Sequence, residues 1–262
     1  MHIVSLIAEV ALAAFVVTEV VRFVPRYRQL KEAVASGDAQ ARTKIYREAL
    51  FFEWVSALLA MASLGFDWTK LNPAVLGLAE FGAIRSLTNG GDAARGAVVG
   101  VAIGVAAGTA GMIAMRLKAK RRGAVRPVGT AQPWWRKLLP DFTALLPVTR
   151  QERVLWLLVS ISAGVCEEVV FRGWLLSALH GQAGLSGAAL IFAAAAAFGL
   201  AHVYQRATGV ILTGLAGALF CILYVATGSL LVPIALHVLV DARFAILPAP
   251  RMQKAQASES YA

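Results

Sequence analysis

Seven stretches of this chain are long and apolar enough to cross a membrane as helices. A helical span needs about 20 consecutive, mostly apolar residues, and 58% of the 262 residues are hydrophobic. The predicted spans are residues 3–23, 49–66, 96–115, 154–179, 185–203, 209–226 and 230–247. A further segment, 71–84, is apolar but short and contains Pro73 and Glu80, so it is either an eighth span or a re-entrant or interfacial piece. The sequence therefore predicts an all-α, polytopic transmembrane helix bundle of about seven spans, or eight.

The positive charge of the chain lies mainly in two loops between predicted spans. The formal net charge is +10, and Lys and Arg residues are concentrated in 26–48 and 116–153. Such loops tend to stay on the cytoplasmic side, so seven spans place the N-terminus outside and the C-terminus inside. Because the basic residues are not interleaved with aromatic ones, we expect them to contact anionic lipid of the bilayer, and we expect no nucleic-acid partner.

Six ionisable side chains interrupt the apolar stretches in the second half of the chain. They are Glu167, Glu168, Arg172, His202, His237 and Asp241. Charges and imidazoles are expensive in hydrocarbon and usually face a shared, partly wet cavity or one another. Their presence in separate spans therefore predicts an intramembrane site.

The spacing of the acidic pair suggests different surroundings for its two members. Glu168 and Arg172 are four residues apart, so on a helix they share one face with the acid ahead of the base. Glu167 is rotated from Glu168 by about 100° of helix and is free to face another neighbour as a general base. The alternative is that both acids only anchor contacts between helices.

Two further pairs have helical spacing. His202 follows Phe198 by four residues, and Asp241 follows His237 by four, which allows the carboxylate to lie beside the imidazole. Taken alone, either pair could be a structural contact between helices.

Taken together, the three motifs resemble a known family. Glu-Glu-x-x-x-Arg, Phe-x-x-x-His and His-x-x-x-Asp follow one another on successive hydrophobic segments. This order is similar to that of the CAAX prenyl proteases and bacteriocin-processing enzymes, the Abi or CPBP family of glutamate-dependent intramembrane proteases. Phe171-Arg172-Gly173 and Thr227-Gly228-Ser229, with Pro233 beyond, add to the resemblance, which covers residues 154–241.

The resemblance implies a role for each motif residue. Glu167 and His202 would polarise a water molecule for attack on a peptide carbonyl, and His237 and Asp241 would face the developing oxyanion. A preorganised oxyanion donor is worth about 3 kcal/mol. Glu168 and Arg172 would form a supporting ion pair that keeps Glu167 aimed, and the family mechanism requires no metal or other cofactor.

Asp241 stands where many members of the family have asparagine. An ionised carboxylate cannot donate a hydrogen bond to an oxyanion. Asp241 is therefore either protonated or acts by orienting His237, and we favour orientation.

The depth of these residues along straight helices argues against their meeting. At about 1.5 Å per residue, Glu167 lies about 20 Å along its helix from Arg153. His237 is near the outer start of its predicted span, whereas His202 is near an inner end. Tilted, broken or unequal helices would be needed to bring the three together.

The sequence thus predicts an integral, multi-pass protein of the bacterial cytoplasmic membrane that cleaves a membrane-associated peptide or protein substrate. We divide it into membrane helices with basic loops at 1–152, a catalytic helical core at 153–247 and a polar tail at 248–262.

Three other functions are compatible with parts of the pattern. One is a zinc protease with Glu167, His202 and His237 as ligands, although no His-Glu-x-x-His motif is present. Another is a catalytically silent scaffold, which could dispense with site residues that this chain retains. The last is a proton-coupled transporter with relay residues in the early spans, for which the candidates are Glu9, Glu19 and Glu53.

Overall fold

The described part of the protein is helical throughout. The computed structural model describes residues 2–66, 110, 114 and 141–246, and these ranges contain no strand. This confirms the all-α class for the described ranges. Most of the predicted span 96–115, the segment 71–84, the loop residues 116–140 and the tail 248–262 lie outside the described residues.

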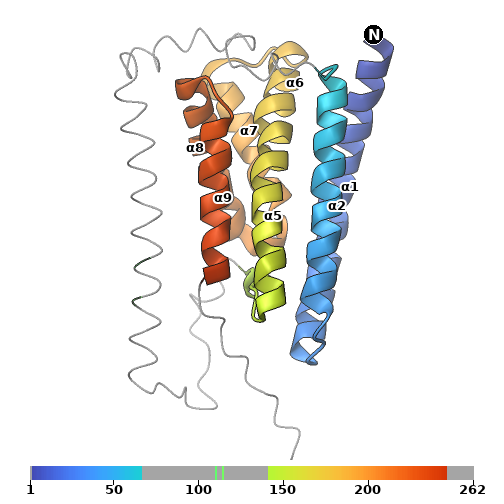
Figure 1. Ribbon diagram of the computed structural model, residues 1–262. Helices are drawn as coiled ribbons and strands as arrows, with labels where there is room; N and C mark the ends of the chain where they lie inside the picture. The colour runs from blue at the N-terminus through green and yellow to red at the C-terminus, as the bar shows by residue number, and fades with distance from the viewer. Residues whose placement is uncertain (1, 67–109, 111–113, 115–140, 247–262) are drawn as a thin grey trace, which may run out of the picture.

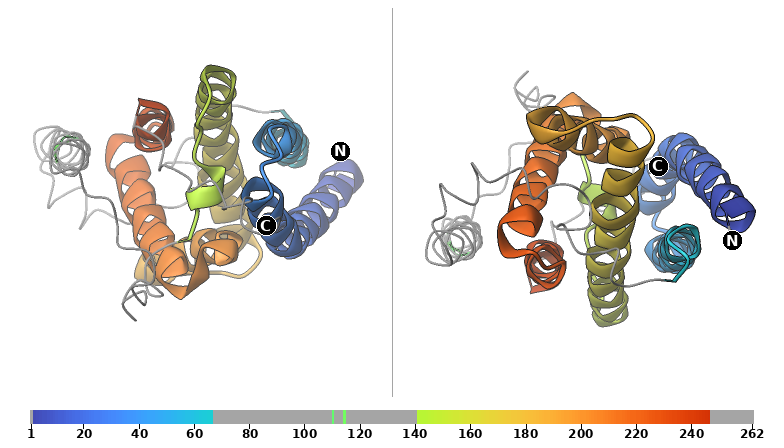
Figure 2. Two further views of the ribbon diagram at one scale, coloured as in Figure 1. Left: turned by 90° about the horizontal axis from the view of Figure 1, so that it is seen from below. Right: turned by 90° about the horizontal axis from the view of Figure 1, so that it is seen from above.

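Antiparallel helices form most of the bundle (Figure 1). The helix α1 (His2–Ala35) packs against α2 (Ala41–Ser63), and α2 in turn packs against α5 (Arg150–Glu168). The helix α7 (Gly187–Ala201) packs against α8 (Arg206–Thr227), and α9 (Leu231–Ile246) runs antiparallel to α5. Figure 2 shows the α1–α2 hairpin on one side of the group formed by α5 to α9.

The polar stretch 26–48 is mostly helical, where the sequence pattern predicted a loop. The helix α1 continues through Pro25 to Ala35, and α2 begins at Ala41. Apolar side chains explain the extension, because Tyr27 and Leu30 of α1 are buried with Tyr46 of α2 and with the short 3₁₀ turn η5 (Thr143–Leu145). Tyr46 donates a hydrogen bond to the carbonyl of Leu145, and burial raises the pKa of its hydroxyl, so it remains a donor.

The predicted span 154–179 is a continuous helical segment that contains a change of helix type. After α5, residues Val169–Leu175 form the π-helical segment η6, and α6 (Leu176–Gly181) completes it. Thr149 and Glu152 start α5 with a capping box, in which each side chain accepts a hydrogen bond from the backbone N–H of the other. The π-helical turns begin directly after Glu168, so the change in helix geometry falls at the acidic pair.

Two segments of the described chain meet the length and composition of a membrane span, namely Arg150–Gly181 and Val203–Thr227. Large apolar side chains also face outward, including Val21 of α1, Phe192 of α7 and Leu215 of α8, which are exposed by 66%, 76% and 63%. Such a surface suits lipid better than water. The total of seven or eight spans stays a prediction.

Glycine permits a close approach of α7 and α8 next to His202. A Cβ atom added at Gly199 would lie 2.5 Å from the backbone oxygen of Val210, and main chain cannot move aside as a flexible side chain can. At Gly214, on the other side of the same contact, the nearest atom would lie 3.4 Å away, which is ordinary van der Waals contact.

We therefore expect Gly199→Ala to separate α7 from α8. Overpacking of this kind costs about 1–3 kcal/mol, so the thermal midpoint of the detergent-solubilised protein should fall by several degrees. Gly214→Ala is the matched control and should be neutral or slightly stabilising, because alanine is the better helix former. Equal midpoints for the two variants, measured by intrinsic fluorescence, would contradict the close approach.

Candidate active site

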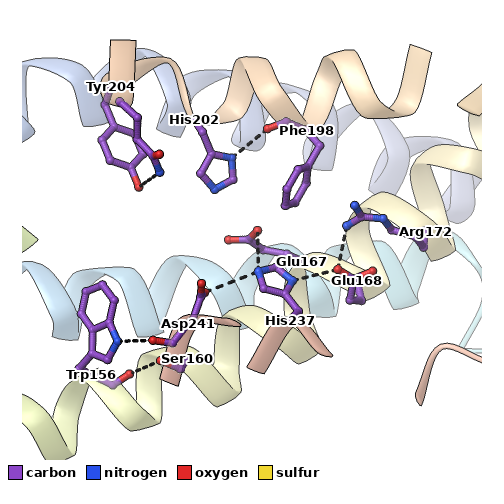
Figure 3. Close-up of polar contacts among 11 residues, drawn as sticks. Trp156, Ser160, Glu167, Glu168, Arg172, Phe198, His202, Tyr204, His237 and Asp241 are labelled. Atoms are coloured by element: carbon purple, nitrogen blue, oxygen red, sulfur yellow. Dashed lines mark hydrogen bonds and ion pairs between the residues drawn. The ribbon is translucent and has the colours of Figure 1, made fainter. Parts of the chain in front are cut away.

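A cavity of about 540 Å³ lies among α1, α2, α5, α7, α8 and α9. Four side chains expected to do chemistry line it, namely Glu167, His202, His237 and Asp241, together with Phe198. Figure 3 shows Glu167 from α5, His202 from the end of α7 and His237 from α9 facing the same space. Glu168 and Arg172 do not line the cavity and lie behind its wall.

Glu168 is completely buried and holds two partners. Its Oε1 atom accepts a hydrogen bond from Nη1 of Arg172 at 2.8 Å, which is the ion pair that the four-residue spacing predicts. The same oxygen lies 2.9 Å from Nδ1 of His237, from a helix distant in sequence. An ionised carboxylate only accepts hydrogen bonds, so Nδ1 of His237 carries the hydrogen. The pattern did not reveal this second contact.

The guanidinium of Arg172 is enclosed by aromatic rings and main chain. Its carbon Cζ lies 4.4 Å from the ring centre of Phe198 and 5.4 Å from that of Phe220. Its Nη2 donates to the carbonyl oxygen of Gly217 at 3.1 Å. The ion pair and two cation–π contacts together offset the cost of burying this charge.

The other face of His237 points into the cavity. Its Nε2 atom is 3.6 Å from Oδ2 of Asp241 and 3.9 Å from Oε2 of Glu167, and the ring stacks on Phe220 with 5.3 Å between centres. Asp241 therefore does lie beside the imidazole, as the spacing allows. It lies on the cavity side, however, whereas Glu168 binds the opposite nitrogen and fixes the orientation of the ring.

His202 is held by its own helix. It follows the last residue of α7, and its Nδ1 lies 2.9 Å from the backbone oxygen of Phe198. A carbonyl oxygen only accepts, so Nδ1 carries the hydrogen and Nε2 of the neutral ring is an acceptor. The Phe198 ring lies 4.9 Å from the His202 ring and 6.0 Å from that of His237, so it sets the spacing of the two imidazoles.

The short helix α7 places His202 at the cavity. It has 15 residues, fewer than the roughly 20 of a full span. Because α7 ends at Ala201, His202 follows its last turn and lines the cavity together with Glu167 and His237.

The cavity also contains ionisable residues that the motifs do not include. Glu53 of α2 and Arg243 of α9 line it, as does Tyr204 in the 3₁₀ turn η7 (Val203–Gln205) after His202. For Glu53, the only signal in the sequence was a charged residue within an apolar stretch. The other two relay candidates have partners, since Glu19 lies 3.8 Å from Arg26 and Glu9 accepts a hydrogen bond from Gln182.

The described residues contain no group of three or more His, Cys, Asp or Glu side chains arranged to hold a metal ion. The sequence allowed a zinc site with Glu167, His202 and His237 as ligands. Among the described residues, these three side chains do not form such a group.

These features define the class as a helical membrane protein with a glutamate and two histidines around a partly buried cavity. Residues 149–243 match a protein family described as type II CAAX prenyl endopeptidase Rce1-like. The match agrees with the family resemblance drawn from the three motifs, all of which lie within the matched residues. No curated protein and no solved structure matches the chain.

Removal of Arg172 should destabilise the fold strongly. Arg172→Ala leaves the buried carboxylate of Glu168 without its cation, and breaking a buried pair in this way costs about 3–5 kcal/mol. Arg22→Ala is the matched control, because Arg22 is 55% exposed and lies 3.7 Å from Glu19, and an exposed pair contributes less than about 1 kcal/mol. Chemical unfolding in detergent tests this difference, and similar losses of unfolding free energy for both variants would contradict a stabilising role of the buried pair.

Proposed function

We propose that the protein is an endopeptidase that hydrolyses a peptide bond of a membrane-associated protein or peptide, with water activated by Glu167 and His202. The observation that carries the proposal is the contrast between the two adjacent acids. Glu168 is fully buried behind the cavity wall, and its Oε1 binds both Arg172 and His237, whereas Glu167 is 25% exposed and lines the cavity. Glu167 is thus the carboxylate of the pair that a water molecule in the cavity can reach.

The geometry supports a division of labour in the first chemical step. Glu167 accepts a proton from the water molecule, Nε2 of His202 accepts a hydrogen bond from it, and the resulting hydroxide adds to the peptide carbonyl carbon. In its doubly protonated form, His237 presents an Nε2–H to the oxyanion that develops. Asp241, 3.6 Å from that nitrogen, supports from the cavity side the ring orientation that Glu168 fixes at Nδ1.

The shape and lining of the cavity support an apolar substrate segment. Side chains from three helices contribute an apolar wall, including Phe15 of α1, Phe52 of α2 and Leu212 of α8. A peptide bond flanked by large apolar residues or by a lipid-like group fits this wall by the hydrophobic effect. We place the enzyme in the bacterial cytoplasmic membrane, with seven or eight spans. Its substrate is then a leader, a pheromone precursor or a C-terminal sorting segment, and a prenylated CAAX tail requires a cell that prenylates proteins.

Exchange of the proposed base should abolish proteolysis without unfolding the protein. Glu167→Gln keeps the size of the side chain but removes the proton acceptor, and loss of a general base lowers the rate by about 10²–10⁴-fold. Asp241→Asn should keep proteolysis, because an amide can still orient His237. Cleavage of an internally quenched, farnesylated peptide with a CAAX ending measures the rates. Proteomics that compares membranes holding the wild-type enzyme with membranes holding Glu167→Gln identifies the native precursor.

The thermal midpoint of each variant serves as the control for folding. A folded Glu167→Gln enzyme with wild-type turnover would remove Glu167 from the role of base. If no precursor accumulates in membranes under any condition, the scaffold becomes the better description.

A further inference from the structure

Glu53 brings a further carboxyl into the cavity from a helix outside the matched family segment. It lies in the middle of α2, and α2 packs against α5. Ser162 of α5 lies next to the Glu53 carboxyl. One carboxyl oxygen, Oε2, is enclosed by protein and has no hydrogen-bond partner in the described structure. Glu53 thus brings an unpartnered oxygen into the wall of the cavity.

The charged neighbours of Glu53 are mostly acidic. Glu167 is the strongest of them, ahead of Asp241 and His237. Cys166 and Tyr204 also lie within electrostatic range. Two arginines line the same cavity. The Nη1 of Arg26 lies 3.8 Å from Glu19 and 3.5 Å from Glu48, and Cζ of Arg243 lies 4.6 Å from the ring centre of Phe244. Within the described residues, Glu53 thus faces Glu167 without an arginine or lysine of its own.

Two carboxyl groups in such surroundings divide the roles of acid and base. Like charges in a poorly hydrated cavity repel each other, so two carboxyl groups there favour sharing one proton. Glu167 and Glu53 each have an Oε2 without a hydrogen-bond partner in the described part of the chain. The cleavage step proposed above names a base for the water, and the leaving amine also needs a proton to depart.

We propose that Glu53 is the proton donor to the leaving amine, as a further catalytic residue that acts opposite Glu167. The inference rests on the proposed peptidase function. Glu167 takes one proton from water, the hydroxide bonds to the carbonyl carbon, and the carbon–nitrogen bond breaks as Glu53 gives its proton to the nitrogen. The proton on Glu167 then passes to the Glu53 carboxylate, which restores both groups, so that one water is consumed for each bond broken.

The sharpest test compares Glu53→Gln with Glu48→Gln. Both acids lie on α2 and line the cavity, but Glu48 is ion-paired with Arg26. Glutamine retains the shape of glutamate and cannot supply a proton. With the farnesylated quenched peptide as probe, Glu53→Gln should lower kcat by about 10²-fold or more, with little change in KM. Glu48→Gln should stay within about threefold of wild type.

The pH profile separates proton donation from a structural role. The wild-type rate should fall at low pH, where a proton blocks the base, and at high pH, where the acid has lost its proton. The residual activity of Glu53→Gln should keep the acid limb and lose the alkaline limb. Ser162→Ala removes the hydroxyl next to Glu53 but leaves the carboxyl of Glu53, so this variant should keep both limbs of the pH profile even if its thermal midpoint falls.

Infrared spectroscopy gives a readout that needs no substrate. The wild-type protein at neutral pH should show the C=O band of a protonated carboxyl, and this band should disappear in Glu53→Gln and persist in Glu48→Gln. A folded Glu53→Gln enzyme with wild-type kcat, both limbs and an unchanged band would overturn the inference. If Glu167→Gln is inactive in the same assay, the proposed function survives that result, whereas an active Glu167→Gln enzyme refutes the proposed function itself.

Discussion

The buried carboxylate of Glu168 is the interaction on which the site depends. One oxygen atom binds Arg172 at 2.8 Å and His237 at 2.9 Å, and Arg172 in turn donates to the main chain of Gly217 on α8. Three parts of the bundle that are distant in sequence are therefore held at one buried point. A buried charge is tolerated only when its partners satisfy it. Glu168 therefore requires Arg172 and the imidazole of His237 together, and Arg172 requires the aromatic rings that enclose it. The orientation of His237 toward the cavity follows from this contact.

The acidic pair shows how neighbours in sequence acquire different functions. Glu167 and Glu168 are the same chemical group, one residue apart, yet one is 25% exposed in a cavity and the other is sealed behind its wall. The rotation of about 100° between consecutive helical residues separates their surroundings. The environment of each carboxyl, and not its identity, then decides which one can act on water.

The sequence predicted the helical class, the Glu168–Arg172 pair and the set of residues that meet in the cavity, because these depend on apolar length and on spacing within one helix. It did not predict the contact between Glu168 and His237 or the place of Glu53, because both depend on how separate helices rotate against each other. The helical continuation of α1 through Pro25 was also missed, since charged residues concealed the buried stripe of Tyr27 and Leu30. The family match covers residues 149–243 and so includes neither α1 nor α2, which nevertheless line the cavity.

The most direct measurement is an experimental structure of the Glu167→Gln enzyme with an uncleaved peptide bound. The account predicts that the scissile carbonyl carbon lies in the cavity between residue 167 and His202, with its oxygen directed at Nε2 of His237. A peptide bound with that carbonyl beyond the reach of residue 167 and both imidazoles, even through one water molecule, would contradict the account.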